Sequence, residues 1–124
     1  MERMLLIGLG GFLGSAARYW LAGVAQRFGG IGFPLGTLAV NVLGSFVLGL
    51  VMALSLERGV GGGEVRIFLA VGLCGGFTTM STFSYETLLL LRAGETTLAC
   101  GNAALTMGAC LAAVWLGDLV ARGL

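Results

Sequence analysis

The segment Gly75–Glu86 reads "GGFTTMSTFSYE": two glycines, then five Ser or Thr residues between positions 78 and 84, then a carboxylate. It is the densest polar patch in a chain that is 57% hydrophobic and only 10% charged. Inside a bilayer no water is present to hydrogen-bond such groups, so each must find a partner within the protein. The segment therefore predicts a site in the interior of a membrane protein.

Four apolar stretches of the length that crosses a bilayer as a helix, about 20 residues, account for most of the chain. They cover approximately residues 4–25, 35–56, 67–91 and 97–117. The connections between them are short. We therefore expect an all-α, multi-pass membrane protein with a single domain, 1–124, of four transmembrane helices. An alternative for the first stretch is a secretory signal peptide, since Arg3, an apolar run and Ser15–Ala17 resemble one.

The composition argues against several classes of function. The chain has neither His nor Lys, and its net charge is only +1, so nothing indicates a nucleic-acid partner. It shows no nucleophile–base pair, which argues against an enzyme. The cysteines lie in apolar segments without metal-binding spacing, and we interpret them as small buried hydrophobic residues. They are Cys74, Cys100 and Cys110.

Small residues recur every four positions in the first and fourth stretches. In the first, Gly10 is followed by Gly14 and Gly11 by Ser15. Two such lines occur in the fourth: Ala104, Gly108 and Ala112, and Ala109, Ala113 and Gly117. This spacing lets membrane helices approach closely. We therefore predict tight helix packing, which leaves little room for a pore within one copy of the chain.

The arginines give only a weak preference for one orientation in the membrane. Arginine in short loops favours the cytoplasmic side. One predicted side holds Arg3, Arg58, Arg66 and Arg122, and the other holds Arg27 and Arg92 with Arg18 near it. This balance permits insertion both ways up, and hence an antiparallel dimer.

Asn41 is the most notable polar residue of the second stretch. Thr37 precedes it and Ser45 follows it by one helical turn each, which makes a polar stripe. One interpretation is an interhelical hydrogen bond, and the other is a pathway for a polar solute. Asn102 and Thr106 in the fourth stretch leave the same two alternatives open.

In the third stretch the glycines at 75 and 76 weaken the helix, so a break is expected there. A broken helix frees carbonyl oxygens, which are ligands for a hard cation. Thr79 and Thr82 share a face with Phe83 and Glu86 by helical spacing. The hydroxyls of this segment can donate hydrogen bonds to an anion. Arg18 could raise the anion concentration at a vestibule, or its side chain could simply extend to the membrane surface.

Three motifs, in order along the chain, resemble those of the small fluoride channels called Fluc or CrcB proteins. "GGFLGSAARY" (10–19) resembles the first-helix pattern G-x-x-G-x-x-x-R of this family. "GTLAVNVLGS" (36–45) resembles G-T-L-x-x-N-x-x-G, and "GLCGGFTTMSTFSYE" (72–86) resembles the G-G-x-T-T-F-S-T-F-S-x-E signature. The resemblance covers essentially the whole chain.

The resemblance implies an antiparallel, dual-topology homodimer with two fluoride pores, exporting fluoride passively across a bacterial or archaeal (inner) membrane. It implies a structural sodium ion, not transported, on the backbone carbonyls of Gly75 and Thr78. It further implies roles for individual side chains: Asn41 as the pore asparagine, Arg18 in the vestibule, Ser81, Thr82 and Ser84 in a polar track, Phe83 with its ring lining the pore, and Glu86 as the carboxylate at its end.

The chain departs from the family signature at Met80, where the family usually has a first phenylalanine. Methionine fills a similar volume but has no positive ring edge to present to an anion.

Two other functions compete with a channel. A small multidrug exporter would need a carboxylate within its first helix, where this chain has only Arg18. A non-transporting assembly subunit would explain the glycines but not the hydroxyl cluster with Asn41.

Overall fold

The computed structural model describes residues 1–124, and all of its regular elements are helical. They are α1 (Glu2–Gly29), α2 (Leu35–Arg58), α3 (Gly62–Arg66), the π-helix η1 (Ile67–Cys74), α4 (Gly75–Phe77), α5 (Met80–Arg92) and α6 (Thr96–Gly123). Four helical stretches are long and apolar enough to span a membrane: Glu2–Gly29, Leu35–Arg58, Gly62–Arg92 and Thr96–Gly123. The prediction of an all-helical chain with four potential spans is confirmed.

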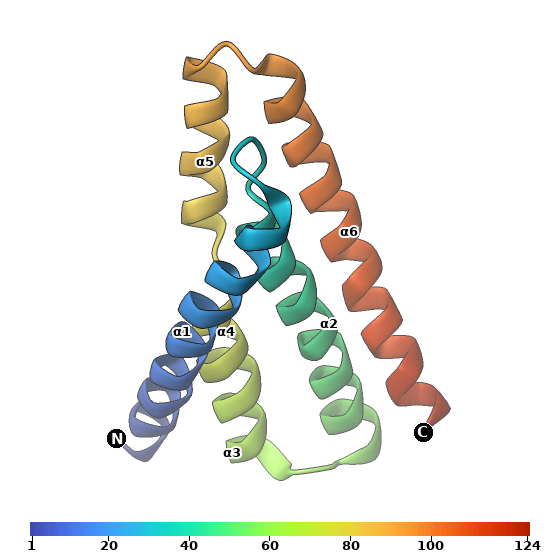
Figure 1. Cartoon of the computed structure of the whole chain (residues 1–124). Coiled ribbons are helices and arrows are strands. Elements are labelled where there is room, and N and C mark those ends of the chain that lie inside the picture. Colours follow the sequence, from blue (N-terminus) through green and yellow to red (C-terminus); the bar gives the residue numbers. More distant parts are fainter.

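The helices form two main packed pairs, and both termini lie at the same end of the molecule (Figure 1). η1 and α4 pack on α1, and α2 packs along α6. The connection between α2 and α3 also lies at the end that holds the termini, whereas α5 and the first turns of α6 reach the opposite end (Figure 1). Successive long helices therefore run between the two ends of the molecule in alternating directions, as expected of a chain with four potential membrane spans (Figure 1).

Glycines bring α1 against η1 and α4. A Cβ atom added to Gly10 would lie 2.6 Å from the carbonyl oxygen of Phe68, and one added to Gly14 would overlap the carbonyl of Leu73. From the other side, a Cβ on Gly76 would lie 2.6 Å from the carbonyl oxygen of Gly11. The close packing predicted from Gly10 and Gly14 is thus present, and no larger residue fits at this crossing.

The crossing of α2 and α6 is built in the same way, but it uses only one of the two predicted lines of small residues. A Cβ on Gly117 would overlap the carbonyl of Phe46, and one on Gly49 would overlap that of Val114. Ala113 is buried on the same line. The other line, which contains Gly108, is exposed, and a Cβ there would meet no atom within 4 Å.

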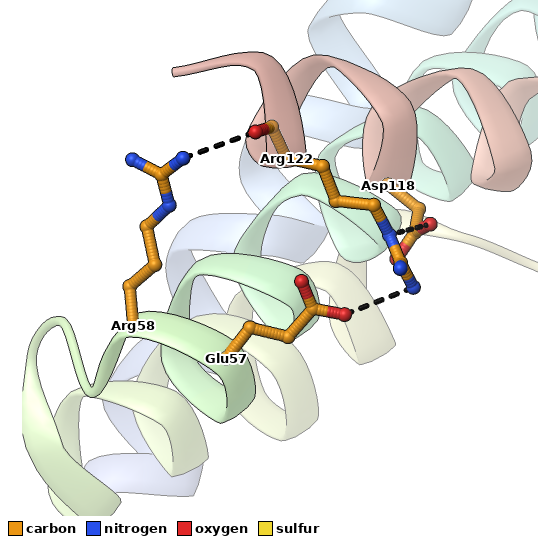
Figure 2. A network of polar contacts seen from close by, with 4 residues as sticks. All are labelled: Glu57, Arg58, Asp118 and Arg122. Carbon is orange, nitrogen blue, oxygen red and sulfur yellow. Dashed lines mark hydrogen bonds and ion pairs between the residues drawn. The ribbon is translucent and has the colours of Figure 1, made fainter.

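At the end that holds the termini, charged side chains join α2 to α6 (Figure 2). The Arg122 guanidinium contacts the Glu57 carboxylate at 2.9 Å and that of Asp118 at 2.7 Å. Arg58 donates to the carbonyl oxygen of Arg122 at 3.0 Å. Exposed pairs of this kind contribute about 0–1 kcal/mol each, so they align the helix ends more than they stabilise the fold.

Between α4 and α5 the helical conformation is interrupted for two residues. Thr78 has φ −84° and ψ 157°, and Thr79 has φ −152° and ψ 111°, both extended. Gly75 and Gly76, where the sequence suggested a break, keep helical geometry. The expected position was therefore wrong by a few residues, because Gly76 serves close packing against Gly11 rather than an unusual backbone conformation.

We predict that Gly117→Ala destabilises the protein while Gly108→Ala does not. The first substitution forces a methyl group into the Phe46 backbone, and overpacking of this kind costs about 1–3 kcal/mol. The second gains helix propensity in open space. Thermal unfolding in detergent measures both. Equal midpoints for the two variants would contradict the assignment of Gly117 to the helix crossing.

Candidate functional site

The side chain of Asn41 holds the interruption between α4 and α5. Its Nδ2 donates to the Thr79 carbonyl oxygen at 3.0 Å, and its Oδ1 accepts from the Thr79 amide at 2.7 Å. The amide side chain thereby satisfies both backbone groups of one extended residue, as a neighbouring strand would. Gly44, one turn along α2, leaves room for the methyl group of Thr78. Asn41 and Thr79 are both 7% exposed, so this pairing is shielded from solvent.

The Thr79 hydroxyl restarts the helix. Its Oγ1 accepts from the Thr82 amide at 3.2 Å, the usual hydrogen bond of a helix N-cap. The same oxygen lies 3.0 Å from the Thr82 hydroxyl and 3.2 Å from that of Ser81. In contrast, Thr78 and Ser84 donate to carbonyls four residues earlier, as isolated hydroxyls in helices commonly do. Three of the five hydroxyls in the signature therefore form one cluster around Thr79.

Four carbonyl groups, those of residues 75 to 78, lose their usual helical donors at this interruption, because Thr78 and Thr79 are extended. In a continuous helix the Thr79 amide would donate to the Gly75 carbonyl, but here it donates to Asn41. The Thr82 amide would donate to the Thr78 carbonyl, but here it donates to Thr79 Oγ1. These four carbonyls include those of Gly75 and Thr78, the two residues expected to bind a cation. Oxygen atoms of this kind suit a hard cation such as sodium.

A cavity of about 830 Å³, here called the arginine cavity, runs along α1 toward the interruption. Arg18 and Arg27 line it, and no carboxylate does. Its deep end reaches the hydroxyl-bearing residues Thr79 and Thr82. The remaining lining residues are Ser15, Tyr19, Trp20, Ala22, Gly23, Val24, Thr37 and Val40.

A second cavity of about 290 Å³, the asparagine cavity, lies on the other side of Thr79. It is lined by Asn41 and by Gly75, Thr78 and Met80 around the interruption. It too is free of acidic residues, and Ser45, Leu48, Ala70, Cys74, Thr106, Met107 and Cys110 complete its wall. Thr79 is the one residue that lines both cavities.

Glu86 lies near a third cavity, of about 420 Å³, which it shares with the loop between α1 and α2. Its Oε1 accepts from the Thr37 hydroxyl at 2.8 Å, and its Oε2 is buried without a hydrogen-bond partner. Thr37 also lines the arginine cavity. The Thr37–Glu86 hydrogen bond therefore stands between two cavities and links α2 to α5.

The remaining predicted site residues are not all gathered in one place. Met80 is 64% exposed and lines the asparagine cavity, whereas Phe83 is 7% exposed and packs within the chain. Ser81 and Ser84 are exposed and line none of the three cavities. Of the predicted hydroxyl track, only Thr82 lines a cavity within this chain.

Asn102 forms a hydrogen bond between helices, whereas Thr106 bonds to Asn102 within α6. Asn102 Nδ2 donates to the Thr87 hydroxyl at 3.0 Å, and the Thr106 hydroxyl donates to Asn102 Oδ1 at 3.3 Å. Asn102 is 1% exposed. Of the two alternatives left open by the sequence, the structure supports interhelical bonding for Asn102, while Thr106 also borders the asparagine cavity.

Two residues of the site, Thr37 and Thr79, make contacts that the sequence pattern does not predict. Thr37 was noted only as part of a stripe with Asn41, and its partner Glu86 is 49 residues away. Thr79 is expected only on a face with Thr82, Phe83 and Glu86, yet it lines both cavities and pairs with Asn41. The stripe on α2 was the signal for Thr37. The face that Thr79 shares with Thr82, Phe83 and Glu86 was the signal for Thr79.

Comparison with protein families places this arrangement in a known group. Residues 5–118 match the family described as "CrcB-like protein, Camphor Resistance (CrcB)".

The chain belongs to the CrcB-like family.

Similar members of the CrcB-like family come from several bacteria. A protein of Methylocella silvestris is 52% identical over 120 residues, covering 94% of this chain and 91% of its own. One from Geobacter metallireducens is 49% identical over 124 residues, which is the full length of both chains. One from Thermus thermophilus is 60% identical over 95 residues, or 77% of this chain and 75% of its own. Each of these three is named "Fluoride-specific ion channel FluC".

Proposed function

We propose that this chain forms a fluoride-selective channel through which fluoride leaves the cell passively, lowering its cytoplasmic concentration. The names of the CrcB-like relatives support fluoride as the permeant ion. The observation that carries the proposal is that Thr79 lines two cavities, one with free guanidinium groups and the other with Asn41. Neither cavity has an acidic residue to repel an anion.

The donors along this route suit a small, strongly hydrated anion. Hydroxyl and amide groups can replace water around fluoride without a fixed positive charge that would trap it. Arg18 raises the local anion concentration within the arginine cavity. The Thr82 hydroxyl follows, and its hydrogen is free to donate because Thr79 donates to its oxygen. Asn41 has one amide hydrogen left after pairing with Thr79, and this hydrogen remains available to the ion.

The proposal includes a structural sodium ion bound where the third span breaks. The carbonyl oxygens of Gly75 and Thr78 fit such an ion, because the amides that would occupy them in a continuous helix are directed elsewhere. Both residues also line the asparagine cavity. Two antiparallel copies of the chain would together present four oxygens to one ion, which the protein retains and does not transport.

An antiparallel, dual-topology homodimer in a bacterial or archaeal inner membrane is the assembly that we propose. The near balance of arginines between the two sides supports it, because neither orientation is strongly favoured. The exposed positions of Met80, Ser81 and Ser84 support it as well. In a dimer these three side chains would complete a pore wall that one chain leaves open, while the buried ring of Phe83 would line it from within each chain.

We predict that purified wild-type protein in liposomes releases trapped fluoride but not chloride, as followed with ion-selective electrodes. Met80→Phe would add a ring edge to the asparagine cavity. A contact worth about 1 kcal/mol changes a rate about fivefold, so we expect release to become faster by about that factor.

The matched control is Met4→Phe, which alters an exposed methionine that lines none of the three cavities. It should leave the rate unchanged. No fluoride release by the wild type above that of empty liposomes would disprove the channel. Equal rates for the wild type and Met80→Phe would show that Met80 does not line the conducting route.

A second prediction concerns sodium. Replacing it with choline at constant ionic strength should lower the thermal stability of the detergent-solubilised protein, because a ligand bound only to the folded state stabilises it. At a concentration about 100 times its Kd, that stabilisation is about 2.7 kcal/mol. Identical unfolding curves in sodium and in choline would contradict the structural ion while leaving fluoride conduction to be judged by the liposome assay.

A further inference from the structure

The arginine cavity contains a second guanidinium group to which neither the sequence motifs nor the proposed route gives a role. Arg27 lines this cavity together with Arg18, and neither forms an ion pair or a side-chain hydrogen bond. At the opposite end of the molecule, Arg58 and Arg122 are engaged in polar contacts (Figure 2). The unengaged arginines of the cavity thus leave their charge available to an anion.

The guanidinium groups of Arg18 and Arg27 lie at different depths in the arginine cavity. Arg18 and Arg27 are nine residues apart on α1, which corresponds to about 13.5 Å along a helix axis. Ser15, nearer the N-terminus, lies beside the interruption, with its hydroxyl 3.4 Å from the Gly76 carbonyl oxygen. Arg18 is half-buried, and Arg27 is exposed in the last turn of α1. Arg27 therefore marks the outer end of the cavity.

We propose that Arg27 is an anion-collecting residue at the mouth of the arginine cavity, which draws fluoride in before it reaches Arg18. This inference rests on the proposed channel function and extends it to a residue outside the recognised motifs. Cavities lined by charge of one sign raise the local concentration of oppositely charged solutes and speed their entry. The absence of carboxylates from the lining leaves the two positive charges uncompensated there.

If Arg27 collects anions, its effect on the rate of fluoride entry depends on ionic strength, whereas the effect of a structural role would not. The Debye length is about 30 Å at 0.01 M ionic strength and about 3 Å at 1 M. The first distance exceeds the spacing of about 13.5 Å between the two arginines, and the second is far shorter. Arg27 should therefore speed fluoride entry strongly in dilute salt and hardly at all in concentrated salt.

The alternative is that Arg27 only complements the partial negative charge at the end of α1, as cations near helix C-termini do. Arg92 provides the matched control for this alternative. It is also in the last turn of its helix, α5, and it is exposed, but it lines none of the three cavities. A helix-end effect would act similarly at both positions.

The test compares fluoride release from liposomes containing wild type, R27Q, R27K or R92Q, at low fluoride concentration. Ionic strength is set with an impermeant salt to about 0.01 M and then to about 1 M. We expect R27Q to release fluoride roughly threefold or more slowly than wild type in dilute salt, and at a similar rate in concentrated salt. R27K keeps the charge and should retain the salt dependence of the wild type, and R92Q should match the wild type throughout.

Equal release by R27Q and wild type at both ionic strengths would overturn this inference alone, and so would the same slowing in R92Q. If R27Q fails to fold, the R27K variant still tests the proposal. R27K keeps the positive charge, so loss of the salt dependence of fluoride release in this variant would contradict the proposal. Absence of release by the wild type would overturn the channel function and this inference together.

Discussion

The pairing of the Asn41 amide with the backbone of Thr79 is the contact on which the site depends. An extended pair of residues inside a membrane helix leaves backbone groups without partners, and hydrocarbon offers none. Asn41 supplies both a donor and an acceptor from α2, at 3.0 and 2.7 Å. The Thr79 hydroxyl then caps α5. Without these two partners, a continuous helix would be the more stable conformation.

The same pairing accounts for how one stretch of backbone would serve the two ions that we propose. Directing the Thr79 amide to Asn41 removes the usual donor from the Gly75 carbonyl, and capping by Thr79 removes it from the Thr78 carbonyl. These oxygens suit a cation, while the hydroxyls and guanidinium groups of the neighbouring arginine cavity suit an anion. In the proposed function, separating carbonyl oxygens from N–H and O–H donors would let a cation and an anion bind close together without a fixed acidic group.

Local patterns in the sequence were enough to predict the four spans, the closely packed glycines and the polar stripe containing Asn41. They placed the interruption too early, because Gly75 and Gly76 favour flexibility while its real position is set by Asn41, 38 residues away in the chain. They also could not show that Gly108 and Gly117 differ, since only the second meets a neighbouring helix. Both failures have one cause: the deciding partner lies on another helix.

Amide hydrogen exchange at Thr79, in wild type, Asn41→Ala and Ser45→Ala, tests this account most directly. Ser45 lies on the same stripe of α2 but forms no hydrogen bond with the interruption. Losing the partner of a buried amide costs about 1–3 kcal/mol, so exchange at Thr79 should be about tenfold faster or more in Asn41→Ala. Wild type and Ser45→Ala should both exchange slowly. Equal exchange in all three proteins would contradict the claim that Asn41 holds the interruption.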